Sequence, residues 1–328
     1  MRTRVVLTID TEPSIAGAFV NPRTNRPLLH EPVWGEVDGR SEALGFVLRT
    51  LREHSLRATF FVETAHTAFF PPRVMGAYVD LIMAADQDVQ LHLHPVWLSF
   101  RDGGHDDASR VTDQCSELEL AQLVDLIDQG SRQIESWTGS RPTGMRTGNF
   151  ATSMHVFEAM SEVGLANSSN VCLACYVPAE LELAVLSGAH RFAGVRELPV
   201  TCFSDIGPVG RGRLRPMQVT ALGGGELLRL LDRIHARREP IAVIATHPFE
   251  FLKRSDHRFS DMKANRLVQR RFEKLCAYLA ANTDRFEVTT LEEAASALDV
   301  TDPMPPLVGN VARSTVRAVE NFVNDRFL

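Results

Sequence analysis

Two histidines stand one residue apart in the segment DVQLHLHPVW, at positions 92 and 94, and a proline follows directly. The segment is typical of a buried strand, and strand side chains alternate between two faces, so His92 and His94 share one side. Leu91 and Leu93 then face the other side, into hydrophobic packing. Imidazoles bind zinc and similar divalent cations, and one carboxylate would complete a three-ligand site with an open position for water. The alternative is a hydrogen-bonded pair in a polar rim.

Two carboxylates follow the first predicted strand, RVVLTID at residues 4–10. Asp10 and Glu12 are spaced i and i+2, so they share one face if the strand continues. One could bind a metal while the other stays free as a base, and the spacing does not decide between them. Glu12 precedes Pro13 and could instead be a turn acid that caps the next segment.

Three more polar residues stand where strands are expected to end: Arg146 in GMRTGNF, Asp205 in CFSDIG and His247 in IATHPFEF. Catalytic groups of parallel sheets gather at the carboxyl ends of the strands. Arg146 could hold a carboxylate by a bidentate contact, or be a surface arginine. His247 could protonate a leaving group, or be a structural histidine.

Segments with strand and helix character alternate along the chain. Apolar runs at 56–64, 196–203 and 240–246 predict strands, and a capping-box signal from Ser116 to Glu119 predicts a helix start. Fully apolar strands that alternate with helices predict a parallel sheet covered by helices. We therefore expect one α/β domain over residues 1–300, a closed or distorted (β/α) barrel, followed by a C-terminal tail at 301–328 with a final helix.

Composition excludes several classes of protein. A net charge of -6 is unlike the basic charge of proteins that bind nucleic acids, and no apolar run is long enough for a membrane span. Five scattered cysteines favour reduced thiols, and the first residues enter a strand directly, so a cytoplasmic location is expected. The sequence gives no indication of oligomeric state.

Taken in order, these motifs resemble the polysaccharide deacetylase family, the NodB-homology group of carbohydrate esterase family four. The matching pieces lie within residues 4–295, and they are LTIDTE, RATFFVE, DVQLHLHP, GMRTGNF, LANSSN followed by ELPVT, and IATHP. The resemblance implies a distorted (β/α) barrel with a divalent metal, usually zinc, that hydrolyses N-acetyl, and sometimes O-acetyl, groups on sugars.

The resemblance also implies roles for individual residues. Asp10 would be the general base, Arg146 would orient it, and His92 would bind the metal. His247 would be the general acid, and Asp205 would hold His247 in its productive tautomer.

Two departures from the family pattern affect the metal ligands. The family's second acid directly follows the first, where this chain has Thr11, and Glu12 is the nearest substitute. The family's second histidine lies four residues after the first, where this chain has Val96. His94 must replace it, as in a branch with an HLHP motif associated with surface-polysaccharide biosynthesis. The expected metal ligands are therefore Glu12, His92 and His94.

The function expected from these motifs is deacetylation of an N-acetylated sugar in surface-polysaccharide biosynthesis. Two alternatives stay open: an amidohydrolase that acts on a small nitrogenous metabolite, and a barrel that binds a glycan without cleaving it. The segments 12–41 and 101–109 are expected to be active-site loops. Four aromatic residues could line a sugar-stacking cleft: Trp34, Trp97, Phe150 and Phe249.

Overall fold

Short runs of β-branched and aromatic residues form the strands, because such side chains pack well on a pleated surface. The computed structural model describes residues 1–103, 111–206, 212–302 and 305–327. Most of the expected loop at 101–109 therefore lies outside the described residues.

The main sheet of the described chain has nine strands in the order β12-β1-β4-β5-β6-β7-β9-β8, with β15 paired to the beginning of β1. All of its pairings are parallel except that of β8 with β9. The strand bounds are β1 (Thr3–Thr11), β4 (Thr59–Glu63), β5 (Asp88–Leu93), β6 (Gly144–Thr147), β7 (Asn167–Ser168), β8 (His190–Phe192), β9 (Val195–Glu197), β12 (Ile241–Thr246) and β15 (Phe286–Val288).

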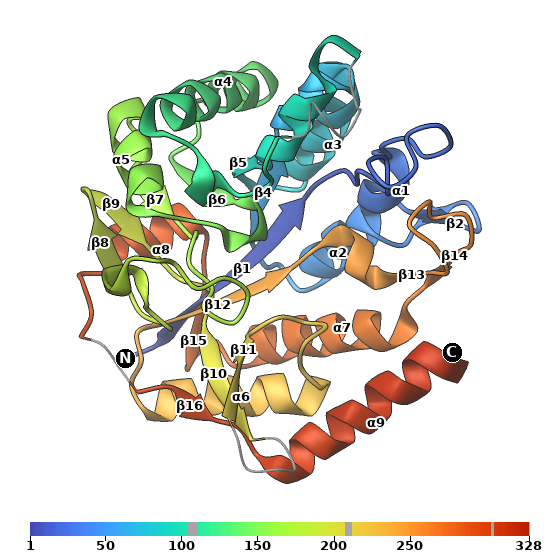
Figure 1. Ribbon diagram of the computed structural model, residues 1–328. Helices are drawn as coiled ribbons and strands as arrows, with labels where there is room; N and C mark the ends of the chain where they lie inside the picture. Colours follow the sequence, from blue (N-terminus) through green and yellow to red (C-terminus); the bar gives the residue numbers. More distant parts are fainter. Residues whose placement is uncertain (104–110, 207–211, 303–304, 328) are drawn as a thin grey trace.

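Helices cover the outside of this curled sheet (Figure 1). They are α1 (His30–Val33), α2 (Leu44–Glu53), α3 (Pro72–Ala84), α4 (Leu120–Thr138), α5 (Met154–Val163), α6 (Gly224–Ala236) and α7 (Arg266–Ala281). Helix α8 (Leu291–Ala297) instead packs in a cluster with the inward-facing Val6 and Phe61. Helix α4 begins four residues after Ser116. Its capping box joins Glu119 to Gln122, so the expected Ser116–Glu119 box is wrong. None of the described helices has the length and apolar character needed to cross a bilayer.

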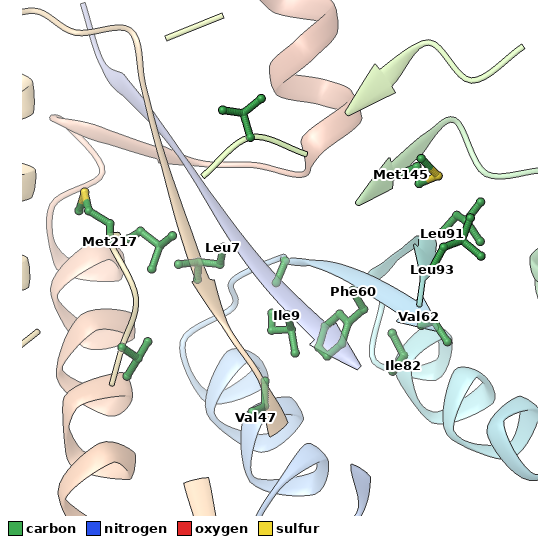
Figure 2. Close-up of a cluster of buried hydrophobic side chains, with 14 of the residues drawn as sticks. Leu7, Ile9, Val47, Phe60, Val62, Ile82, Leu91, Leu93, Met145 and Met217 are labelled. Atoms are coloured by element: carbon green, nitrogen blue, oxygen red, sulfur yellow. The ribbon is translucent and has the colours of Figure 1, made fainter. Parts of the chain in front are cut away.

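The two-residue period of the strands separates two faces of the sheet. The outer face is apolar, and the inner face carries a second apolar cluster, with Val6 and Phe61 among its members, together with polar groups near the strand ends. Figure 2 shows Leu7 and Ile9 of β1 with Phe60 of β4 on the side of α2, where Val47 lies. Leu91 and Leu93 of β5 belong to the same buried cluster. The residues that neighbour these in sequence, such as Asp10 after Ile9 and His92 between Leu91 and Leu93, therefore face the concave inside of the sheet.

The sheet does not close by a continuous ladder. Single backbone hydrogen bonds bridge its two ends, from Val200 N–H to the Val171 carbonyl and from Thr201 N–H to the Val243 carbonyl. The expected strand at 196–203 is in fact two strands in different sheets, β9 and β10 (Cys202–Ile206). Pro199 lies between them and has no N–H to donate to a ladder. The predicted distorted (β/α) barrel is confirmed as an open, curled half-barrel.

Small sheets and a final helix flank the barrel. β10 pairs with β11 (Gly212–Pro216) and β16 (Leu307–Val308), β13 (Leu252–Arg254) pairs with β14 (Met262–Ala264), and β2 (Glu36–Val37) pairs with β3 (Arg40–Ser41). Helix α9 (Val311–Phe327) lies beside α6 and α7 (Figure 1). A boundary between a domain at 1–300 and a tail at 301–328 stays a prediction.

Candidate active site

Strand register brings the polar strand ends together. Ile9 of β1 is opposite Thr246 of β12, so the residues that follow them, Asp10 and His247, lie side by side. In the same way His92 of β5 is opposite Arg146 of β6. Polar side chains from β1, β5, β6 and β12, which are far apart in sequence, thus lie at one edge of the half-barrel.

Glu12, His92 and His94 converge on one point. The Glu12 Oε2 atom lies 3.0 Å from His92 Nε2 and 2.8 Å from His94 Nε2. One ligand atom from each residue lies within 4.8 Å of the other two, so the three could hold a metal ion. The two rings stand edge to face with their centroids 5.1 Å apart. The prediction that both histidines of the HxH pair share one face is confirmed.

The outer nitrogen of each imidazole is held by its own acceptor. His92 Nδ1–H donates to the backbone carbonyl of Arg146 at 2.8 Å, and His94 Nδ1–H donates to Asp113 Oδ1 at 2.9 Å. A neutral imidazole that donates from Nδ1 presents a lone pair on Nε2. Without a metal, the contacts of the two Nε2 atoms with the Glu12 carboxylate need a protonated imidazole as donor. With a metal, the same Nε2 atoms would direct their lone pairs at one shared position. Metal-binding histidines are commonly oriented in this way.

The charges of the cluster favour a cation at this point. Burial alone would raise the pKa of Glu12, but the imidazoles of His94 and His92 outweigh it and hold the pKa of this carboxyl well below its usual range. Burial alone would lower the pKa of His94, but the carboxylates of Glu12 and Asp113 raise it well above the usual range. The donor set fits a divalent metal: two imidazoles and one carboxylate, with Asp113 behind one imidazole.

Asp10 lies beside this cluster and is held by Arg146. The Arg146 guanidinium is fully buried and donates from Nη1 to Asp10 Oδ1 at 2.6 Å. Its other donors reach Thr8 Oγ1 and both the carbonyl and hydroxyl of Ser169, and its Cζ lies 4.4 Å from the centroid of the Phe61 ring. The contact with Asp10 therefore uses one nitrogen rather than the expected two, and Asp10 Oδ2 stays free of Arg146.

His247 is oriented by Glu250. Its Nδ1 lies 3.1 Å from Glu250 Oε1, and its Nε2 lies 3.7 Å from Asp10 Oδ2. Burial alone would lower the pKa of His247, but Glu250, together with the charges of Asp10 and Glu12, raises it to about 9. An imidazole with this pKa is protonated at neutral pH and can act as an acid.

The structure does not bring Asp205 to His247, so the expected role for Asp205 is wrong. The Asp205 carboxylate binds Arg215, Ser314 and Arg317, and no hydrogen bond or ion pair joins it to His247. The reason is topological, because Asp205 lies on β10 in a separate three-stranded sheet. Glu250 takes the place that Asp205 was expected to fill.

A cavity of about 170 Å³ opens beside the metal cluster. Its wall includes Glu12, His94 and Asp113, and the aromatic side chains of Trp97 and Phe249. The cavity also includes Pro13, Ser14 and Ile15, so the beginning of the expected loop at 12–41 does border the site.

The other two expected aromatic residues have different neighbours. Phe150 lies over the Arg146 guanidinium, with Cζ 5.2 Å from its ring centroid, and Trp34 stacks on Tyr78. Neither belongs to the wall of the cavity beside the metal cluster.

Sequence reasoning missed Asp113, Glu250 and Ser169. Glu250 had a usable signal, because it follows His247 by three residues, the separation of neighbours on one helical turn. Asp113 lies in irregular chain before α4, and Ser169 acts partly through its carbonyl, so neither carries a pattern in sequence.

Comparison with known proteins identifies the fold. No protein-family model and no curated protein matches the chain by sequence. Among solved structures, an inferred polysaccharide deacetylase from Mycobacterium smegmatis is 16% identical, with a TM-score of 0.56 over 93% of this chain and 95% of that one.

Two more distant structures bear related descriptions. A family 4 carbohydrate esterase from Streptomyces lividans, in complex with acetate, is 12% identical over 92% of this chain and 98% of that one, with a TM-score of 0.45. A family 4 pseudoenzyme from Bacillus anthracis is 13% identical over 90% of this chain and 66% of that one, with a TM-score of 0.44. The Mycobacterium smegmatis structure shows that this chain has the fold of a protein described as a polysaccharide deacetylase, and at 16% identity the likeness concerns the fold alone.

Proposed function

We propose that this protein is a metal-dependent hydrolase that removes the acetyl group from an N-acetylated sugar. The observation that carries the proposal is the convergence of Glu12, His92 and His94 beside Asp10 and His247. A metal centre, a free carboxylate and a protonated imidazole are the three components that hydrolysis of an amide needs.

Glu12, His92 and His94 would hold a divalent cation, and zinc is the first choice for two imidazoles and one carboxylate. When bound, the metal supplies Lewis-acid activation of a water molecule and of the acyl carbonyl.

The protein's own groups then move the protons. Asp10 Oδ2, the oxygen that Arg146 leaves free, accepts a proton from the attacking water. Arg146 holds Asp10 Oδ1 and so fixes the direction of the free oxygen. His247 Nε2 faces Asp10, and its proton passes to the departing amine nitrogen. Glu250 holds His247 Nδ1 and leaves Nε2 as the acidic position.

The substrate in this proposal is an N-acetylated sugar of surface-polysaccharide biosynthesis, met on the cytoplasmic side. The resemblance of the HLHP motif to a branch associated with that process supports the assignment. The half-buried ring of Phe249 in the cavity wall is available for contact with a sugar ring.

Metal analysis tests the metal centre. Purified protein is expected to contain about one divalent metal ion per chain, and a His92→Ala, His94→Ala double variant is expected to contain none. His155→Ala, which changes an exposed histidine of α5, is the matched control and should keep the metal. Full metal retention in the double variant would contradict the ligand assignment.

Acetate release from a panel of N-acetylated sugars, with and without chelator, tests the reaction. Release that the chelator abolishes is expected, and Asp10→Asn should lower kcat by about a hundredfold or more while the metal stays bound. Hydrolysis of small cyclic or linear amides in place of sugars would favour the amidohydrolase alternative. Bound metal with no hydrolysis of any acyl substrate would favour a glycan-binding barrel.

A further inference from the structure

Arg254 brings a positive charge to the wall of the cavity beside the metal cluster. It ends β13, seven residues after His247, and it lines the same cavity as Glu12 and His94. Its side chain is exposed to solvent, so a ligand can reach it.

Arg254 has no acidic partner among the described residues. No carboxylate there lies within 4.0 Å of its guanidinium nitrogens, and the guanidinium makes no hydrogen bond to a described residue, while the charge of Asp256 acts on it only from a longer distance. The nearest acid in sequence, Asp256, instead accepts hydrogen bonds from the backbone N–H groups of Arg258 and Ser260. A guanidinium has five donors in a fixed planar fork, which suits a carboxylate or a phosphate.

Two phenyl rings hold the guanidinium in place. Arg254 Cζ lies 4.3 Å from the centroid of the Phe259 ring and 5.9 Å from that of Phe249. Phe249 in turn stacks on the imidazole of His247, with the ring centroids 4.8 Å apart. This series of contacts places the arginine next to the proposed general acid.

The backbone of Phe259 supports a role for this arrangement. Its φ of 57° lies in the left-handed region, which is unfavourable for a bulky residue, and its side chain is buried. With this backbone conformation, the phenyl ring is buried against the Arg254 guanidinium. Such outliers persist where the surrounding structure requires them.

The two acids of the cavity wall are already engaged. Glu12 faces His92 and His94, and Asp113 binds His94 and the side-chain amide of Asn149. Among the described charged groups of this wall, Arg254 is therefore the one that forms no ion pair, and Asp256 acts on it only from a longer distance.

We propose that Arg254 binds an anionic group of the substrate, a phosphate or a carboxylate, at the mouth of the cavity. This inference rests on the proposed function and narrows it to an N-acylated sugar that carries a negative charge. The cavity of about 170 Å³ is below the range of pockets that enclose a whole ligand, so the acylamino group enters and the charged group stays at the mouth.

Calorimetric binding to the metal-loaded protein tests the inference with three probes: N-acetylglucosamine, N-acetylglucosamine 1-phosphate and N-acetylglucosaminuronic acid. At least one charged sugar is expected to bind about tenfold or more tightly than the neutral one, because a charge-assisted bidentate contact is worth about that factor. Arg254→Gln should remove this advantage and leave binding of the neutral sugar unchanged. Arg258→Gln, an exposed arginine of the same hairpin outside the cavity wall, is the control.

The two charged probes distinguish phosphate from carboxylate as the group that is recognised. Equal affinity for all three sugars, no binding of either charged sugar, or an advantage that survives in Arg254→Gln would overturn the inference. The measurements are made in the metal-loaded Asp10→Asn background, where turnover is expected to be slow, so these results stand even if the wild-type protein releases no acetate. Absence of acetate release with binding intact would instead reject the proposed function.

Discussion

At the scale of single residues, the two histidines of the HxH pair differ in what holds their outer nitrogens. His92 donates to a backbone carbonyl, which a side-chain substitution cannot remove. His94 donates to the carboxylate of Asp113, which accepts a further hydrogen bond from Asn149. Of the two acceptors, only Asp113 can therefore be changed by a side-chain substitution.

Asp113→Asn tests how much this contact contributes. The change removes the charge behind His94 and leaves the three ligands in place, and loss of such a partner weakens metal binding by about 10- to 100-fold. Competition with a chromophoric chelator would measure the affinity. Asp125→Asn, on the exposed side of α4, should bind metal as the wild type does. An unchanged affinity in Asp113→Asn would mean that Glu12 and the histidines orient themselves.

The pair of His247 and Glu250 predicts a pH dependence. His247 must be protonated to donate, so kcat/KM should fall as pH rises through the imidazole pKa of about 9. Glu250→Gln removes the neighbouring carboxylate charge, so the pKa falls toward the ordinary 6.5 and the alkaline limb moves to lower pH. Glu273→Gln on α7 is the control, and pH–rate profiles supply the measurement. An alkaline limb that stays in place would contradict the assignment of His247 as the acid.

At the scale of elements, the sequence predicts correctly the features that depend on the two-residue alternation of side chains along a strand. The alternation of Leu91, His92, Leu93 and His94 predicts one apolar and one polar face, and the structure has both. The parallel sheet follows from the apolar strands, because both of their faces are buried.

Other features had no local signal. Asp205 follows an apolar segment, as the other candidate site residues do. However, the chain breaks at Pro199, and the strand that carries Asp205 belongs to a different sheet. Asp113 and Arg254 reach the cavity from irregular chain and from a hairpin, where no period predicts the direction of a side chain. Which strand ends converge depends on non-local pairing.

A glycine after β6 determines how closely two elements approach. A Cβ atom at Gly148 would lie 2.5 Å from two atoms of the His94 ring, closer than real contacts allow. Gly148→Ala is therefore expected to push His94 out of position and to reduce metal affinity about tenfold or more, in line with the loss of a positioning contact. The global fold should persist, because the ring borders a cavity into which it can move.

Metal titration together with thermal unfolding of the metal-free protein separates these effects. Gly224→Ala, at a position where a Cβ atom meets ordinary contacts, is the matched control. Wild-type metal affinity in Gly148→Ala would show that the site tolerates displacement of His94.

At the scale of the whole molecule, a buried charge network joins the last helix to the barrel. Arg317 of α9 donates to Glu226 of α6 at 2.6 Å and to Asp205 of β10 at 2.5 Å. Arg215 and Ser314 complete the contacts of Asp205. All three members of the central group are nearly buried, so removal of one leaves its partners uncompensated.

Asp205→Asn distinguishes a structural role from a catalytic one. We expect the free energy of unfolding at pH 7 to fall by about 3 kcal/mol, because Arg317 loses a buried counter-charge, while metal content and kcat stay as in the wild type. Burial alone would raise the pKa of Asp205, but Ser314, Arg215 and Arg317 outweigh it and lower the pKa below its ordinary 3.8. This contribution is therefore present above pH 3.8 and is lost as pH falls below it, so the two proteins should converge in stability in acid. Denaturant titrations across this pH range supply the measurement, with Asp302→Asn at an exposed position as the control. A loss of kcat without a loss of stability would return Asp205 to the catalytic machinery.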